Sequence, residues 1–152
     1  MRAALREAAR AASQGEVPVG AVVIHEGRIV GRGRNRVEAN RDAMAHAEIL
    51  ALRQASKKLG CWRLSGCTLF VTLEPCAMCA GALVQSRIER LVLACRDPKF
   101  GACGSIFDIL REKRLNHRVE VTEGLLADES QALLVGFFRS KRTKGAERWP
   151  SG

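Results

Sequence analysis

Residues 67–95, CTLFVTLEPCAMCAGALVQSRIERLVLAC, contain the pattern that decides the fold expected for this chain. The apolar run 67–73 predicts a buried strand, and 90–95 predicts another. Between them, 76–86 predicts a helix that begins directly after Pro75. Strands that alternate with helices in this way indicate a sheet that is covered by helices on its faces.

The rest of the chain continues this alternation. Working outward, we expect helices at 2–14, 47–59 and 127–144, strands at 17–24, 28–33 and 119–122, a short helix at 106–111, and polar loops at 35–43 and 96–105. The prediction is therefore an α/β fold: one domain over 1–144, with a mixed sheet of about five strands in a three-layer α/β/α arrangement. Residues 145–152 are expected to form a flexible tail.

Length and composition agree with a single soluble domain. The chain has 152 residues, of which 47% are hydrophobic and 27% charged, enough for a core that needs no disulfides. No apolar run approaches the roughly 20 residues that span a bilayer, so no membrane association is expected. The six cysteines do not resemble a disulfide framework, and a reducing cytoplasm is the expected location.

The charge indicates a polyanionic partner. Lys and Arg number 25 against 16 Asp and Glu, a net charge of +9. The basic residues gather in two stretches, 28–41 and 139–148, and the alternative is a solvated basic face that only aids solubility. There is no Tyr and little other aromatic surface, which argues against a general platform for stacking single-stranded bases.

Three residues form a candidate metal site. His46, Cys76 and Cys79 offer one imidazole and two thiolates, and no fourth protein ligand is apparent. Structural zinc sites usually have four protein ligands, whereas hydrolytic sites keep one position for water. Glu48 is then placed to move protons for that water. The alternatives are a buried cysteine pair in a core helix or a redox Cys-x-x-Cys.

Helix geometry constrains this site. Residues 76 and 79 share one helix face, and a helix N-terminus after Pro75 favours their thiolate forms. Residues two apart in a regular helix point roughly 200° from each other, so His46 and Glu48 cannot both face one ion from a helix interior. His46 must therefore lie at or before the first turn of its helix.

The order H-x-E…P-C-x-x-C is the signature of zinc-dependent nucleobase deaminases. With the flanking segments, the chain closely resembles the bacterial tRNA-specific adenosine deaminases, of the cytidine deaminase-like fold. The resemblance is carried by 15–22, 45–49, 71–83, 86–88, 96–97, 116–119 and 137–139. It implies a homodimer with one Zn²⁺ per subunit that converts the wobble adenosine of an arginine tRNA to inosine.

Residue roles follow from the same resemblance. It makes His46, Cys76 and Cys79 the zinc ligands and Glu48 the proton shuttle. The positions it matches to substrate contacts are Asn35 at the flipped nucleotide, Val19 and Ala45 lining the pocket, Asp97 and Lys99 on a loop along the RNA, and Arg139, Lys141 and Arg142 at a helix end along the RNA. The chain departs from the family pattern at Ala43-Met44, which replace the family's Pro-Thr. The sequence assigns no role to Glu74.

Two other functional classes compete with this one. A deaminase of free cytosine or guanine shares the motif but has no need of a +9 charge. A non-catalytic subunit that binds zinc or RNA has no need of Glu48, and a closed structural zinc site needs a fourth ligand that the sequence does not provide.

Overall fold

The computed structural model describes residues 1–146, and the side chains of residues 1–144. Its helices are α1 (Arg2–Ser13), α2 (Val37–Asn40), α3 (Ala47–Leu59), α4 (Ala77–Gln85) and α5 (Ala127–Ala146), with a 3₁₀ turn, η1, at Ile109–Arg111. Its strands are β1 (Gly20–His25), β2 (Arg28–Arg34), β3 (Cys67–Leu73), β4 (Arg90–Cys95) and β5 (Glu120–Glu123).

The five strands form one mixed sheet in the order β2-β1-β3-β4-β5. Strand β1 runs antiparallel to both of its neighbours, β2 and β3, while β3, β4 and β5 are parallel to one another. The predicted mixed sheet of about five strands is therefore confirmed. The parallel half contains the strand-helix-strand segment 67–95 from which the fold was predicted.

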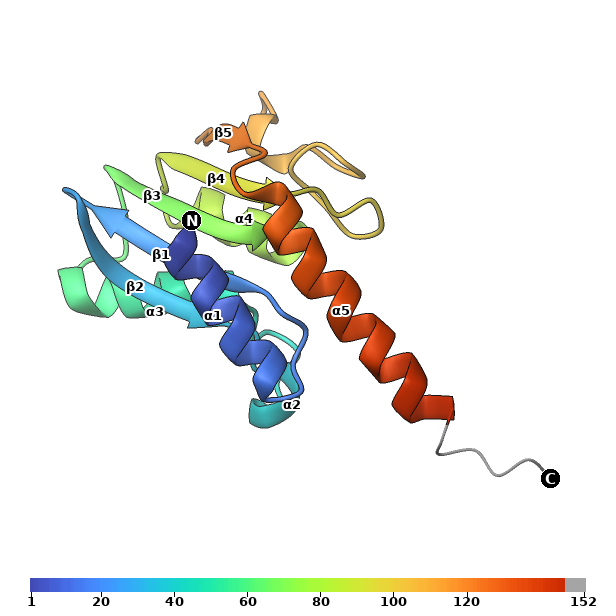
Figure 1. The fold of residues 1–152 in the computed structure, drawn as a ribbon. Helices are drawn as coiled ribbons and strands as arrows, with labels where there is room; N and C mark the ends of the chain where they lie inside the picture. The colour runs from blue at the N-terminus through green and yellow to red at the C-terminus, as the bar shows by residue number, and fades with distance from the viewer. Residues whose placement is uncertain (147–152) are drawn as a thin grey trace.

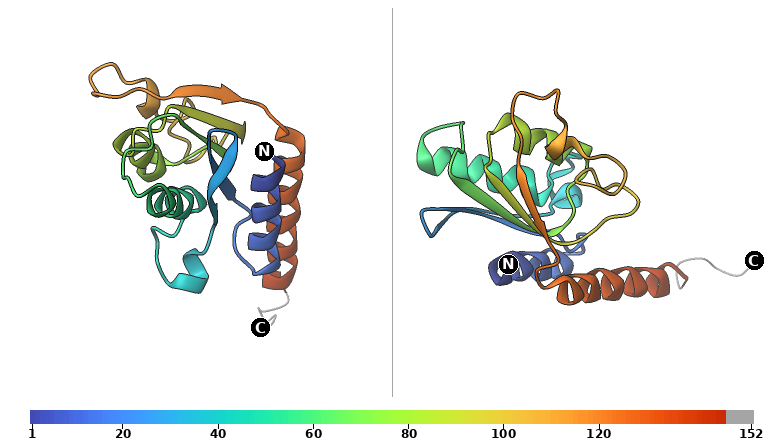
Figure 2. Two further views of the ribbon diagram at one scale, coloured as in Figure 1. Left: turned by 90° about the vertical axis from the view of Figure 1, so that its left-hand side faces the viewer. Right: turned by 90° about the horizontal axis from the view of Figure 1, so that it is seen from above.

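Helices cover both faces of the sheet. Helices α1 and α5 lie together on one face, and α3 and α4 lie on the other (Figures 1 and 2). This is the predicted three-layer arrangement. The main core lies between the sheet and the α3–α4 layer, where residues such as Leu69, Leu83 and Leu93 are fully buried.

Small residues bring α3 unusually close to β2. A Cβ atom added to Gly33 would lie 2.0 Å from the carbonyl oxygen of Ala47, and one added to Gly31 would lie 2.2 Å from that of Ala51. Neither distance is possible for a real side chain, so both positions require glycine. The close packing fixes the start of α3 against the sheet, and His46 directly precedes that start.

Several predicted boundaries were wrong. β1 begins at Gly20 rather than at 17, because Val17 and Val19 form a tight turn around Pro18, whose nitrogen has no hydrogen to donate to a ladder. The predicted polar loop 35–43 contains the short helix α2. Its backbone N–H groups at Glu38 and Ala39 donate to the buried carboxylate of Glu16, at 3.2 and 2.8 Å, a long-range contact that no local pattern reveals.

The later elements also differ in extent. The helix expected at 106–111 is only the 3₁₀ turn η1, and the strand expected at 119–122 is β5 at Glu120–Glu123. Helix α5 includes Gly145 and Ala146, which were predicted to be tail, because one Gly in a helix costs only about 1 kcal/mol and need not end it. The rest of the predicted tail, 147–152, lies outside the described residues. Within 1–146, no helix is both long and apolar enough for a bilayer span.

Candidate active site

Two helix N-termini meet at the candidate metal site. His46 is the N-cap residue of α3 and Cys76 is the N-cap residue of α4, and both have extended backbone conformations. Cys79 lies in the first turn of α4. Because His46 precedes the helix, the angular conflict with Glu48 does not arise, as the sequence required. The orphan N–H groups of both helix ends favour anionic donors in this space.

The donor atoms have the separations of a tetrahedral zinc site. His46 Nδ1 lies 3.7 Å from Cys76 Sγ and 3.5 Å from Cys79 Sγ, and all three donor atoms lie within 4.8 Å of one another. Zinc bonds of about 2.3 Å to sulfur and 2.0–2.1 Å to nitrogen, meeting at a tetrahedral angle, would separate S and N by about 3.6 Å. The three side chains are therefore already arranged to hold a metal ion.

The two cysteines of the site differ in acidity. Hydrogen bonding from Cys79 and His46 lowers the pKa of Cys76, so Cys76 is the thiolate of the pair. The bond to Cys76 and burial raise the pKa of Cys79. The contact with Cys76 also raises the pKa of His46. A thiolate is thus present at neutral pH before any metal binds, which suits a zinc ligand.

Glu48 is a buried acid beside the ligands. Its side chain belongs to the first turn of α3 and is only 4% exposed. Burial raises the pKa of Glu48 to about 7, although its own backbone N–H and the neighbouring His46 act to lower it. A carboxyl group with a pKa near the working pH can both accept and donate a proton, which is the property required of a general acid–base group.

A cavity of about 400 Å³ opens over this site. The volume is in the range of small-molecule pockets. Its wall combines the catalytic candidates with apolar side chains and one amide; the lining residues are Val17, Val19, Asn35, His46, Ala47, Glu48, Leu73, Glu74, Cys76, Asp97 and Phe100. The structure therefore brings together segments from five separate parts of the chain around one candidate metal site.

Two of the three predicted pocket residues line the cavity, and the third is buried in the protein interior. Asn35 and Val19 both line the cavity, and the Asn35 N–H donates to the Val19 carbonyl at 3.0 Å. The Asn35 Oδ1 accepts from the Val37 N–H at 3.4 Å, which orients the amide at the wall. Ala45 is fully buried and is not a lining residue; its carbonyl accepts from the Arg36 N–H at 3.0 Å.

The loop after β4 forms one side of the cavity mouth. Asp97 lines the cavity, and its Oδ1 accepts from the N–H groups of Lys99 and Phe100, at 2.9 and 3.2 Å. Lys99 is exposed beside the mouth and does not line it. Phe100 lines the mouth and remains 72% exposed. Asp97 therefore both lines the cavity and holds the turn of the loop.

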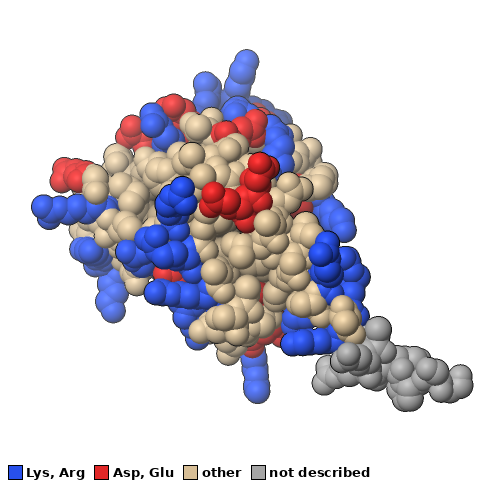
Figure 3. Space-filling view, viewed as in Figure 1, with Lys and Arg blue, Asp and Glu red and all other residues tan. Residues whose placement is uncertain are grey.

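The basic residues of α5 lie apart from the cavity wall. Arg139, Lys141 and Arg142 are exposed, and none of them lines the cavity. The Lys141 ammonium lies over the Phe137 ring, 5.4 Å from its centre. Figure 3 shows acidic side chains over the start of α5, where Asp128 and Glu129 lie, and basic side chains along its second half.

Comparison with known proteins identifies the family. The MafB19-like deaminase family model matches residues 1–142. The tRNA-specific adenosine deaminase of Bacillus subtilis is 48% identical over 144 residues, 95% of this chain and 89% of the relative. That of Aquifex aeolicus is 48% identical over 142 residues, 93% of each chain. A solved structure from a study of A-to-I editing by tRNA:A34 deaminases has a TM-score of 0.85 at 43% identity, covering 88% of this chain and 97% of that one.

The chain belongs to the tRNA-specific adenosine deaminases. Its fold is also similar to that of a guanine deaminase from Nitrosomonas europaea, with a TM-score of 0.75 at 32% identity, covering 88% of this chain and 80% of that one. The likeness to that enzyme is weaker in both sequence and shape. In this member of the family the candidate site combines three side chains that could hold a metal ion with one buried acid beside a cavity.

Sequence reasoning missed several lining residues of this deaminase. Val17, Leu73 and Phe100 line the cavity but carry no motif signal, because apolar side chains are ordinarily read as core. Glu74 was noticed without a role. In the structure it is 3% exposed and also lines the cavity. Burial acts to raise the pKa of Glu74, but hydrogen bonds led by that of Ser105 outweigh burial and lower it.

Proposed function

We propose that this protein hydrolyses adenosine to inosine at the first anticodon position of a tRNA, with an arginine tRNA as the substrate class. The observation that carries the proposal is the buried Glu48 beside the preformed His46, Cys76 and Cys79 group, inside a cavity open to solvent. Relatives at 48% identity are named for this activity. The net charge of +9 supports a polyanionic substrate over a free base.

The residues of the site divide between metal binding and proton transfer. His46, Cys76 and Cys79 would hold one Zn²⁺ per subunit, and that ion would supply Lewis-acid activation by lowering the pKa of a water molecule toward about 7. Glu48 accepts a proton from the attacking water, delivers it to N1 of the adenine and then assists protonation of the departing amine. The bond from C6 to oxygen forms first, with N1 protonated, and the bond from C6 to the protonated amine then breaks, so adenosine and water give inosine and ammonia.

Other residues at the cavity would bind the nucleotide. Asn35 would offer its amide to the base and Val19 an apolar contact, and Asp97 would lie where the RNA enters, with the exposed Lys99 beside it. Ala45 is fully buried behind this wall and would act only by packing. An adenine stacked in a helix cannot reach a cavity of this kind, so the target must be extruded or already unstacked, as in an anticodon loop.

The basic end of α5 would bind phosphate away from the chemistry. Arg139, Lys141 and Arg142 are exposed on the second half of the helix. The two cysteine ligands must stay reduced, so the cytoplasm is the location we propose.

A homodimer is part of the same proposal. It is supported by an exposed groove of about 510 Å³ between α3 and α4 in which the side chain of Trp62 is 58% exposed; the lining residues are Ile49, Leu52, Arg53, Ser56, Trp62, Ala82, Gln85 and Ser86. Light scattering of the purified protein measures its oligomeric state, and a monomer at micromolar concentration would contradict this part of the proposal.

The activity is tested by two assays. In the first, the purified zinc protein is offered anticodon stem-loops with adenosine at the first anticodon position, the same loops with that adenosine moved by one position, and free adenine, guanine and cytosine. We expect inosine in the first substrate alone. In the second, the host's arginine tRNAs are sequenced with and without this protein. Release of ammonia from a free base, with no inosine in RNA, would instead assign the protein to the free-base deaminases.

A further inference from the structure

Glu74 accepts four hydrogen bonds through its side chain, and all four come from one loop. Its Oε1 accepts from the N–H groups of Cys103 and Ser105, both at 3.0 Å. Its Oε2 accepts from the Asp97 N–H at 2.9 Å and from the Ser105 hydroxyl. The donors span residues 97–105, which we call the mouth loop. A buried carboxylate is costly unless it is hydrogen-bonded, so this one depends on the mouth loop being in place.

The mouth loop is built closely around this carboxylate. A Cβ atom on Gly101 would lie 2.4 Å from Glu74 Oε2 and 2.5 Å from the Asp97 carbonyl oxygen, so the loop has room only for glycine there. The next residue, Ala102, donates its N–H to the Pro75 carbonyl at 2.8 Å. Gly101 also forms an isolated antiparallel bridge with Cys76. The mouth loop is therefore anchored along the segment that ends in a metal ligand.

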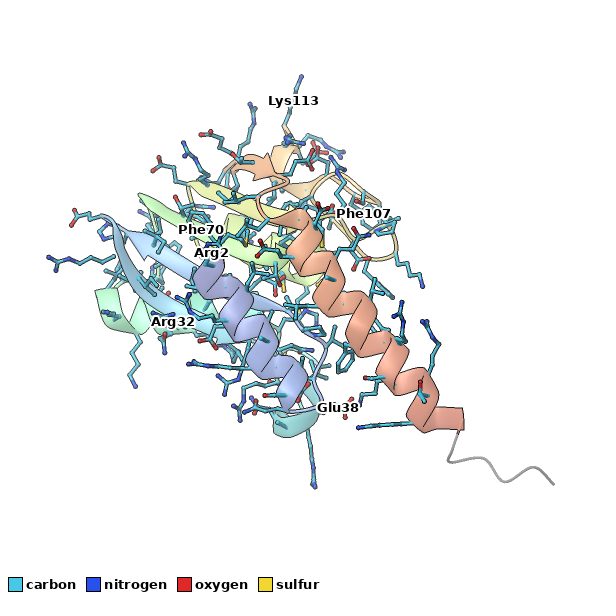
Figure 4. All side chains as sticks on the ribbon, viewed as in Figure 1. Arg2, Arg32, Glu38, Phe70, Phe107 and Lys113 are labelled. Carbon is cyan, nitrogen blue, oxygen red and sulfur yellow. The ribbon has the colours of Figure 1, made fainter. Side chains whose placement is uncertain are left out.

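The anchored loop carries part of the cavity wall. Asp97 and Phe100 both line the mouth, and the side chain of Phe100 is 72% exposed there. Phe107, further along the segment that follows β4, is 59% exposed (Figure 4). A loop that exposes large apolar side chains gains little stability from burying them. Its conformation therefore depends on other contacts, such as hydrogen bonds to a buried group.

We propose that Glu74 is a positioning residue: it holds the mouth loop against the metal-ligand segment and so sets the shape of the cavity mouth that receives the nucleotide. Glu74 acts through the loop and takes no part in proton transfer. The effect on substrate binding rests on the proposed function, whereas the effect on the loop does not.

The variant Glu74→Gln tests this proposal with little change in size. The amide oxygen of Gln can still accept from Cys103 and Ser105, but its NH₂ group then faces the Asp97 N–H, so a donor meets a donor. Losing one hydrogen bond to a charged carboxylate should shift the equilibrium between the anchored and the detached mouth loop by roughly tenfold or more. Glu123→Gln is the matched control, because Glu123 is an exposed carboxylate whose described hydrogen bonds come from the Arg96 guanidinium, next to the mouth loop, and not from residues 97–105.

Three measurements are made on the zinc-loaded variants: amide hydrogen exchange of the peptide that covers 96–108, zinc content, and deamination kinetics on the anticodon stem-loop. For Glu74→Gln we expect exchange in the mouth loop to rise by roughly tenfold or more, zinc to stay stoichiometric, and apparent KM to rise far more than kcat falls. Glu123→Gln should match the parent protein in all three. A merely structural role would lower the fraction of active protein, and hence kcat, with KM unchanged.

Unchanged exchange in Glu74→Gln, or faster exchange with an unchanged KM, overturns the proposal, as does loss of zinc with the loop intact. A parent protein that deaminates no RNA would contradict the proposed function while leaving the exchange result to decide the anchor.

Gly101→Ala is the second variant, for the case in which Glu74→Gln does not fold. It displaces the same carboxylate from the loop side, without changing the charge. Its control is Gly136→Ala on α5, where an added Cβ meets nothing within 4 Å. Faster exchange of 96–108 and a raised KM in Gly101→Ala, with Gly136→Ala unchanged, supports the anchor; parent-like exchange in Gly101→Ala overturns it.

Discussion

Replacing Glu48 with Gln should nearly abolish catalysis without loss of zinc. The same variant should also show, through the pH dependence of unfolding, that the Glu48 carboxyl is buried. Glu48 is not among the three metal donors, so zinc should remain stoichiometric. The amide cannot carry a proton from water to the base, and the loss of a general acid–base group costs about 10² to 10⁴-fold in kcat. Metal analysis and single-turnover inosine formation measure the two effects on one preparation.

The structure also determines how Glu48→Gln changes the free energy of unfolding. In the metal-free protein the pKa of Glu48 rises from 4.5 to about 7 on folding. The folded state therefore holds the proton more tightly, and stability falls as pH rises through the window from 4.5 to about 7. At 1.36 kcal/mol per pH unit, the full penalty above this window is about 3 kcal/mol. Gln cannot ionise and avoids the penalty.

The assay is chemical unfolding of the metal-free parent and Glu48→Gln proteins, under reducing conditions, between pH 4.5 and 8. We expect little difference at the acid end and an advantage for Glu48→Gln of about 3 kcal/mol at the neutral end. The titration of His46 contributes to the unfolding free energy of both proteins, so most of its contribution cancels in the difference between them at each pH. A bound dication offsets the burial of the carboxylate, so zinc should shrink the advantage. A difference that does not change with pH would refute a buried Glu48 whose pKa is raised.

Three further variants probe other parts of the molecule. Cys76→Ser should lose zinc first and activity as a consequence, because a hydroxyl stays protonated where a thiolate is needed; stoichiometric zinc in this variant would contradict the ligand assignment. Gly33→Ala puts a Cβ 2.0 Å from the Ala47 carbonyl, so unfolding free energy should fall by about 1–3 kcal/mol and zinc affinity with it, whereas Gly81→Ala, with open space, should match the parent. Replacing Arg139 and Arg142 with Gln should weaken binding of every RNA alike and reduce the salt slope by roughly one unit per charge, with kcat unchanged. Lys57→Gln with Lys113→Gln is its control, since Lys113 projects at the end of the molecule opposite to the end of α5 (Figure 4), and an equal loss there would show that only net charge matters.

The candidate chemistry was largely readable from sequence. His46, Glu48, Cys76 and Cys79 lie in two short motifs, and metal ligands require particular residue types at particular spacings, so a local pattern carries the information. The structure added that both ligand segments are helix N-caps and that the donor atoms are already spaced for zinc. The cavity wall was less readable, because Leu73 and Phe100 enter it by tertiary placement alone.

By itself, the sequence determined the α/β class, the alternation of elements and the residue types that could hold a metal, since periodicity, capping and ligand chemistry act over a few neighbouring residues. Only the tertiary structure decided what Glu16, Glu74 and Gly101 do. Their partners are 22 to 31 positions away for the carboxylates, and the requirement for glycine at 101 comes from an oxygen atom of Glu74. Such contacts depend on how separate segments pack, and packing at native density is a property of the whole fold that no local stretch of sequence encodes.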